Sequence, residues 1–304
     1  MSDILIHGAT SFLGKHFLRK LISERTPVII LARESSNLSS VESNSLVKIV
    51  RYKKTLSEID ISSINSKSLS FFEFSWSGVF GSDRNNPEQI TVNIPLIISS
   101  IELANQHKAK HWIGIGSQAE YGNLNKRLNE DDSCKPTTLY GKSKLICSQI
   151  SSELCKYFGM EHSWLRLFSV YGPEDNHEWL IQYLMREMLG NKEINVTRGE
   201  QLWDYLYVDD IAEMFLKLKD AKGVGIANLG SGKAVQVKYI IEKIKEFTKS
   251  NSRINFGQVP YRDDQVMFME ADVSKLSNHL NWSPKTSIEE GLIRTINFMQ
   301  LKNV

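Results

Sequence analysis

A glycine-rich turn between a short apolar run and an amphipathic segment is the feature that most constrains this chain. Ile4-Leu5-Ile6 ends at Gly8, apolar residues then recur at helical spacing over residues 12–21, and a second apolar run covers residues 28–31. A strand, a helix and a strand within about 30 residues form a βαβ unit, whose two strands are parallel neighbours. The start of the chain therefore predicts a parallel sheet.

The same alternation continues through the first half of the chain. It predicts strands near residues 46–50, 71–74, 111–115 and 163–168, and helices near residues 91–106 and 140–158. Continuously apolar strands between amphipathic helices indicate a sheet covered on both faces. Beyond Gly172 the elements shorten, with a helix near 178–189 and strands at 194–196 and 204–208, while residues 226–229 are expected to rejoin the main sheet.

The predicted fold is therefore α/β, a Rossmann-type doubly wound parallel sheet with a smaller C-terminal α/β lobe. The expected core comprises residues 1–172, with 224–250 returning to it, and the lobe comprises 173–223 and 251–304. Only 7 of 304 residues are proline and no linker-like tract separates the parts, so the lobe is expected to pack on the core.

Composition excludes several classes of protein. Lys+Arg 37 against Asp+Glu 35 gives a net charge of +2, which predicts no nucleic-acid partner. The three cysteines form no CxxC pair, so we expect reduced thiols in the cytoplasm and no metal site. The longest mainly apolar stretch, residues 92–104, contains proline, serine and glutamate and is too short to span a bilayer, so no membrane association is expected.

The turn after the first strand reads Gly8-Ala-Thr-Ser-Phe-Leu-Gly14. Glycine allows a tight turn there and lets backbone N–H groups approach a pyrophosphate at a helix N-terminus. The alternative is a tight turn with no ligand. Dinucleotide binding is favoured, and the predicted contacts are Gly8, Thr10, Ser11, Phe12 and Leu13.

The end of the second strand bears on which dinucleotide is bound. Asp or Glu usually accepts from the ribose 2′-OH of NAD at this place, whereas this chain has Arg33, followed by Glu34, Ser35 and Ser36. A guanidinium with hydroxyl neighbours suits the 2′-phosphate of NADP(H), which is the predicted cofactor. The alternative is a solvated arginine with Glu34 as the ribose acceptor, which would favour NAD.

Tyr140 and Lys144 stand one helical turn apart, and Ser117 follows a predicted strand. A nearby ammonium favours the phenolate, so we expect Lys144 to lower the pKa of Tyr140 and make it a proton shuttle for a carbonyl or an alcohol. Ser117 is placed to bond the same oxygen. A surface Tyr-xxx-Lys pair without function is the alternative.

With these motifs the chain resembles the extended short-chain dehydrogenase/reductases, in the nucleotide-sugar branch of the NAD-dependent epimerase/dehydratase family. The resemblance covers nearly the whole chain, including residues 8–14, 117–122, 140–144, 167–173, 203–210 and 282–284. It implies catalysis by Ser117, Tyr140 and Lys144, and a C-terminal lobe that binds a nucleotide-diphosphate sugar. The predicted cofactor contacts also include Ser75, Phe168, Tyr140 and Lys144. The resemblance also implies a homodimer formed through the helices that flank the serine strand.

Departures from the family pattern narrow the reaction. Gln118 and Ala119 stand where dehydratases of this branch have an acidic pair, so dehydration is disfavoured. Ala119 also stands where GDP-fucose synthases have a cysteine, so that activity is disfavoured too. Trp203 replaces a common arginine, while Arg262 matches another diphosphate-binding arginine. Glu120 has two alternative roles, a hydrogen bond to a sugar hydroxyl or a brace for its loop. The residues predicted to bind substrate are Trp76, Gln118, Glu120, Ser169, Trp203 and Arg262.

The segment around Trp76, together with residues 118–120, is similar to the sugar C4-reductases that include CDP-abequose and CDP-paratose synthases. The predicted activity is NADPH-dependent reduction of the C4 ketone of a nucleotide-linked 4-keto-6-deoxyhexose or 3,6-dideoxyhexose. CDP, dTDP, UDP and GDP stay open as the nucleotide. The alternatives are an NAD-dependent nucleotide-sugar 4-epimerase and a catalytically idle sensor of NADP(H).

Overall fold

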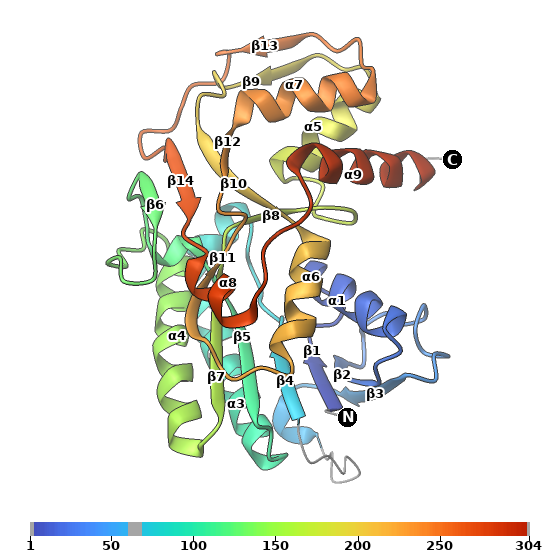
Figure 1. The fold of residues 1–304 in the computed structure, drawn as a ribbon, viewed down its shortest axis with the longest axis vertical. Helices are drawn as coiled ribbons and strands as arrows, with labels where there is room; N and C mark the ends of the chain where they lie inside the picture. The colour runs from blue at the N-terminus through green and yellow to red at the C-terminus, as the bar shows by residue number, and fades with distance from the viewer. Residues whose placement is uncertain (1–2, 60–68, 303–304) are drawn as a thin grey trace.

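A parallel seven-stranded sheet dominates the computed structural model, which describes residues 3–59 and 69–302 (Figure 1). Its strands, in their order across the sheet, are β3 (Val47–Tyr52), β2 (Val28–Arg33), β1 (Asp3–His7), β4 (Leu69–Glu73), β5 (His111–Ser117), β7 (Glu161–Leu167) and β11 (Gly225–Leu229). The predicted α/β fold is confirmed, and residues 226–229 rejoin the sheet within β11.

Helices cover both faces of this sheet, as alternate side chains of its strands require. Ile4 and Ile6 pack on the face covered by α1 (Phe12–Ser23), α6 (Val208–Leu218) and α8 (Ser274–Leu280). Leu5, between them, packs on the opposite face with α3 (Asn93–Gln106) and α4 (Leu139–Phe158). No helix within residues 3–59 and 69–302 has the length and apolar character needed to cross a membrane.

The smaller lobe is built on short strands and three helices. One sheet runs β12 (Ala234–Gln236), β10 (Leu202–Tyr207), β14 (Phe268–Ala271) and β6 (Lys126–Leu128), and β8 (Ser169–Tyr171) also pairs with β10. A second sheet pairs β9 (Ile194–Val196) with β13 (Ile254–Phe256). The apolar core of the smaller lobe includes side chains of α5 (Leu180–Leu189), α7 (Val237–Thr248) and α9 (Ile288–Lys302).

Four one-turn segments complete the described elements: η1 (Leu56–Glu58), η2 (Gly81–Asn85), α2 (Glu88–Thr91) and η3 (Gln118–Glu120). Of these, η2 and α2 follow β4, and η3 follows β5 directly. They therefore stand at the carboxyl ends of central strands, where open parallel sheets bind ligands.

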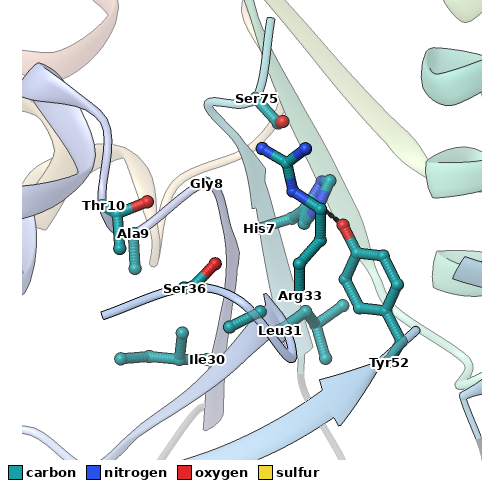
Figure 2. Close-up of a pocket in the computed structure, with 11 residues that line it drawn as sticks. His7, Gly8, Ala9, Thr10, Ile30, Leu31, Arg33, Ser36, Tyr52 and Ser75 are labelled. Atoms are coloured by element: carbon teal, nitrogen blue, oxygen red, sulfur yellow. Dashed lines mark hydrogen bonds between the residues drawn. The ribbon is translucent and has the colours of Figure 1, made fainter. Parts of the chain in front are cut away.

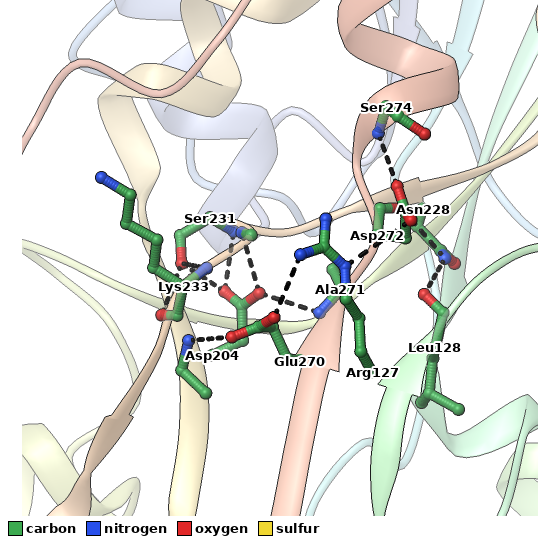
Figure 3. A network of polar contacts seen from close by, with 12 residues as sticks. Arg127, Leu128, Asp204, Asn228, Ser231, Lys233, Glu270, Ala271, Asp272 and Ser274 are labelled. Carbon is green, nitrogen blue, oxygen red and sulfur yellow. Dashed lines mark hydrogen bonds and ion pairs between the residues drawn. The ribbon is translucent and has the colours of Figure 1, made fainter.

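A buried aspartate ties the smaller lobe to the loop that follows β11 (Figure 3). The Asp204 carboxylate, on β10, accepts from the backbone N–H groups of Ser231, Gly232 and Ala271 at 2.7, 3.0 and 3.0 Å. Asn228, in β11, donates to the carbonyl of Leu128 in β6 at 2.9 Å. Because these bonds join β6, β10 and β14 to the end of a main-sheet strand, they fix the lobe beside the sheet's carboxyl edge.

Candidate active site

The glycine turn forms a tight cradle at the start of α1. Gly8 has φ of +82°, and a β-carbon there would lie 2.6 Å from the backbone nitrogen of Ser75. A β-carbon on Gly14 would lie 2.2 Å from the Gly8 carbonyl oxygen, so neither position has room for a side chain. Ser11 caps the helix by accepting from the Gly14 N–H at 3.1 Å. This open helix N-terminus fits the pyrophosphate of a dinucleotide.

A pocket opens beside this cradle at the carboxyl ends of β1 and β2 (Figure 2). Its wall brings together Gly8, Thr10, Arg33, Ser36 and Ser75 from the predicted cofactor set. Phe12 and Leu13 form the first turn of α1. Ser35 is exposed and does not line the pocket.

Arg51, which sequence reasoning missed, holds the loop that follows β2. Its Nη1 donates to the carbonyl oxygens of Arg33, Glu34 and Ser36 at 3.3, 3.1 and 3.1 Å. The residue lies in β3, beside β2 in the sheet. A sequence signal would have been an arginine near the end of the strand predicted to neighbour β2, since such a side chain reaches the adjacent loop.

Ser117, Tyr140 and Lys144 meet where β5 ends and α4 begins. Thr138 caps α4 by accepting from the Gly141 N–H at 3.1 Å, which starts the helix just before Tyr140. The Lys144 Nζ donates to the carbonyl of Ile115 in β5 at 2.6 Å and lies 5.8 Å from the Tyr140 ring centroid. Ser117 lies close enough to Tyr140 for its side chain to favour the ionised phenol. The structure therefore brings the three predicted residues together.

Burial controls the charge of this set. It raises the pKa of Tyr140, while the Ser117 side chain and the charge of Arg84 oppose that rise. It also lowers the pKa of Lys144 to about 7 against the influence of Cys147, Glu120 and Glu73. The sequence predicts a lowered pKa for Tyr140. The net shift is upward instead, because desolvation of the phenolate outweighs the groups that favour its charged form.

Trp76 lies against Tyr140 and Lys144 and is held there by its neighbours. The Lys144 Nζ is 3.5 Å from its ring centroid, and the Tyr140 ring stands edge-on to it at 6.0 Å. The indole Nε1 donates to Gln89 Oε1 at 2.9 Å. Gln89 is 1% exposed and donates in turn to the carbonyls of Gly78 and Asp83. These contacts fix the indole as a wall of the site.

Glu120 braces the serine. Its carboxylate is completely buried and accepts from the Ser117 N–H, the Trp164 Nε1–H and the Arg166 Nε–H, each at 2.9 Å. With both oxygens engaged and neither exposed, the structure supports the bracing alternative for Glu120 and not contact with a sugar. Trp164 and Arg166 belong to β7 and were not predicted to take part.

The remaining predicted residues occupy varied surroundings. Trp203 donates to Ser169 Oγ at 2.5 Å, so these two predicted substrate residues contact each other. Phe168 is buried in an apolar cluster with Tyr121. Gln118 is partly exposed in η3, at the end of β5. Arg262 is exposed on the loop between β13 and β14, with Nε 3.9 Å from Asp264 Oδ1.

A glycine cradle after the first strand of a Rossmann-type sheet, with Ser, Tyr and Lys gathered at β5 and α4, defines an enzyme of the short-chain dehydrogenase/reductase class. The chain belongs to the NAD dependent epimerase/dehydratase family, whose profile matches residues 4–230. Membership supports a nicotinamide dinucleotide as its cofactor. No group of three or more His, Cys, Asp or Glu residues in the described ranges is arranged to hold a metal ion.

Known relatives match the chain over its length. It is 31% identical to the CDP-abequose synthase of Salmonella muenchen, covering 98% of each chain, and 26% identical to the UDP-glucuronate 4-epimerase of Thermodesulfobacterium geofontis, covering 98% and 96%. The fold is similar to the UDP-glucose 4-epimerase of Thermotoga maritima, solved with UDP-glucose, with a TM-score of 0.86, 23% identity and coverage of 99% and 100%.

Proposed function

We propose that this protein is an NADPH-dependent reductase of the C4 ketone of a nucleotide-diphosphate 4-keto-6-deoxyhexose or 3,6-dideoxyhexose. The observation that carries the proposal is the 31% identity to a CDP-abequose synthase along nearly the whole length of both chains. The departures at Gln118 and Ala119 agree with it, because dehydration across C5 and C6 needs an acid and a base that these residues do not supply.

The glycine cradle and the pocket beside it are the proposed site of NADP(H). Gly8 and the N-terminus of α1 would receive the pyrophosphate, and Arg33 with Ser36 would receive the 2′-phosphate. A reductase consumes its reduced cofactor at every turnover, which agrees with use of NADPH. In this proposal the seven-stranded sheet with its covering helices binds the cofactor, and the smaller lobe, which includes β6, β12 and α7, binds the nucleotide sugar.

When bound, the reduced nicotinamide supplies a hydride to the ketone carbon. Tyr140 donates the proton that the ketone oxygen gains, and a raised pKa keeps its phenol protonated at neutral pH for that purpose. Ser117 donates a hydrogen bond that orients the same oxygen. Lys144 contributes the positive charge that favours proton release from Tyr140.

The substrate is proposed to lie along Trp76, Gln118, Ser169 and Trp203, with Arg262 on its diphosphate. Trp76 offers an apolar face beside Tyr140, which suits the methyl group of a 6-deoxy sugar. Arg262 is exposed and positively charged, as a group that recruits a diphosphate needs to be.

We also propose that the enzyme is a homodimer through α3 and α4. Two apolar side chains on α4, Ile146 and Tyr157, are 39% and 82% exposed, and Val92, which caps the N-terminus of α3, is 45% exposed. Light scattering coupled to size exclusion tests this, and a monomer at micromolar concentration would contradict it.

Oxidation of NADPH by nucleotide-linked 4-keto-6-deoxyhexoses tests the proposed reaction. CDP, dTDP, UDP and GDP sugars are supplied in turn, and absorbance at the NADPH band is followed. The proposal predicts one NADPH oxidised per sugar reduced with at least one nucleotide. Interconversion of 4-hydroxy epimers with no net oxidation of NADPH would contradict it.

An NAD-dependent nucleotide-sugar 4-epimerase is the second candidate. It uses the same Ser117, Tyr140 and Lys144, and the 26% identity to a UDP-glucuronate 4-epimerase favours it. Arg33 at the end of β2, where NAD enzymes usually carry an acidic residue, argues against it. NAD that remains bound through purification would favour the epimerase.

A further inference from the structure

Three buried polar side chains from three strands form a chain of hydrogen bonds beneath the cofactor pocket. His7, at the end of β1, lies with Nδ1 2.9 and 2.8 Å from the two carboxylate oxygens of Glu73 in β4. Its Nε2 lies 2.8 Å from the hydroxyl of Tyr52, the last residue of β3. His7 and Glu73 are each 2% exposed and Tyr52 is 7% exposed. We call these three residues the Glu73 relay.

The relay reaches the surface of the pocket at both of its ends. Tyr52 and His7 line the pocket (Figure 2). At the other end, Glu73 Oε1 accepts from the backbone N–H of Ser75 at 2.8 Å, and Ser75 also lines the pocket. A buried imidazole and carboxylate add little stability where apolar side chains would pack as well, so their orienting effect is the better account of their presence.

The carboxylate, together with a neutral imidazole, sets the direction of the bonds in the relay. A carboxylate only accepts, so His7 Nδ1 carries the proton that Glu73 receives. In the neutral imidazole Nε2 is then the acceptor, and the Tyr52 hydroxyl donates to it. The free lone pairs of the Tyr52 oxygen are left as an acceptor at the pocket wall.

Arg33 is the cation that shares this wall. Figure 2 shows its side chain running beside Tyr52, with the guanidinium on the side of Ser75. Its charge acts on the Tyr52 hydroxyl, opposing the burial that raises the pKa of this tyrosine. An oxygen that presents lone pairs to a guanidinium attracts it electrostatically, and this attraction would favour a position of Arg33 across the pocket.

We propose that the Glu73 relay positions Arg33 to bind the 2′-phosphate of NADP(H), so that Tyr52 is a positioning residue for selectivity between NADP(H) and NAD(H). The inference rests on the proposed NADPH dependence and adds to it a set of residues outside the glycine turn and the loop after β2. Tyr52 acts through Arg33 and has no contact of its own with the phosphate.

Calorimetric binding of two probes to the full chain tests the relay. The probes are adenosine 2′,5′-bisphosphate, which has the 2′-phosphate, and adenosine 5′-monophosphate, which lacks it. Tyr52→Phe, which keeps the ring, is expected to weaken the bisphosphate about 5-fold, because Arg33 loses the oxygen that attracts it, and to leave the monophosphate within about 2-fold. In an Arg33→Ala background the same change is expected to have no further effect.

Each other result has a definite meaning. Equal weakening of both probes by Tyr52→Phe would show a merely structural role and overturn the inference. The same 5-fold loss in the Arg33→Ala background would also overturn it, because Tyr52 would then act independently of Arg33. Failure of the unaltered protein to prefer the bisphosphate would instead contradict the proposed NADPH dependence, and the relay inference would fall with it.

Discussion

The ammonium nitrogen of Lys144 lies 3.5 Å from the ring centroid of Trp76. Burial disfavours a charged lysine, whereas the face of an indole favours one, so the two effects oppose each other at this side chain. Burial, opposed by Cys147, Glu120 and Glu73, lowers the pKa of Lys144 to about 7, close to physiological pH. We expect the indole of Trp76 to favour the charged form of this proposed catalytic lysine.

This pKa predicts a pH dependence for the proposed reduction. Below pH 7 the ammonium is present and favours proton release from Tyr140; as pH rises through about 7 the charge is lost. We therefore expect kcat/KM to fall on the alkaline side of about pH 7. A profile that stays flat to about pH 9 would contradict a catalytic role for the charge of Lys144.

Two substitutions at Trp76 test whether its indole affects the pH dependence of kcat/KM. Leucine removes the aromatic face, which stabilises an ammonium by about 0.5–2 kcal/mol, so the pKa of Lys144 should fall by about 0.4–1.5 units. Trp76→Leu is then expected to move the alkaline limb to lower pH, and Trp76→Phe to move it less. Identical profiles for the two variants and the unaltered protein would show that the contact has no electrostatic effect.

Tyr140→Phe removes the proposed proton donor and keeps the ring that packs against Trp76. Loss of a general acid should lower kcat about 10²- to 10⁴-fold, while cofactor affinity stays nearly unchanged. Steady-state kinetics and calorimetry measure the two effects. Tyr157→Phe is the control, since this tyrosine lies on the same helix and is 82% exposed. Comparable activity of both variants would remove Tyr140 from the mechanism.

Glu120→Gln tests the brace behind Ser117. The change leaves the Arg166 guanidinium buried without its partner charge, which typically costs about 3–5 kcal/mol in the free energy of unfolding. Urea denaturation measures it, with Glu102→Gln on the exposed side of α3 as a control expected within about 0.5 kcal/mol. A loss below about 1 kcal/mol for Glu120→Gln would mean that the pair is not the buried brace described above.

Gly8→Ala tests the cradle. The new methyl group would lie 2.6 Å from the Ser75 nitrogen, and φ of +82° is unfavourable for alanine, so cofactor binding should be lost. Gly190→Ala is the control, because the nearest atoms to its new methyl group are 3.6 Å away and its φ is −83°. Calorimetric titration with NADPH separates them. Normal affinity in the Gly8 variant would exclude this turn as the pyrophosphate site.

The local patterns predicted the strands, helices and turn of the first half well, because each pattern lies within one short stretch of sequence. The turn at Gly8 and the pair Tyr140 and Lys144 are of this kind. The strands β6 and β12, each of three residues, were not predicted, since three residues show no periodicity. Their place in a sheet comes from tertiary pairing with β14 and β10.

Contacts between distant residues account for the rest of what sequence reasoning missed. Glu120 bonds to Trp164 and Arg166, 44 and 46 positions away, and no spacing rule joins them. His7 and Glu73 are 66 positions apart and meet only because β1 and β4 are neighbours in the sheet. A buried acidic residue next to a catalytic motif could be noticed in the sequence, but its partners could not.

Transfer of deuterium from NADPH labelled at the hydride position of its nicotinamide ring tests the central claim most directly. The labelled cofactor is incubated with a nucleotide-linked 4-keto-6-deoxyhexose, and the sugar product is examined by NMR and mass spectrometry. The proposed reduction predicts one deuterium at C4 of the product for every NADP⁺ formed. A 4-hydroxy sugar without deuterium, formed with no net loss of NADPH, would contradict it and favour the epimerase.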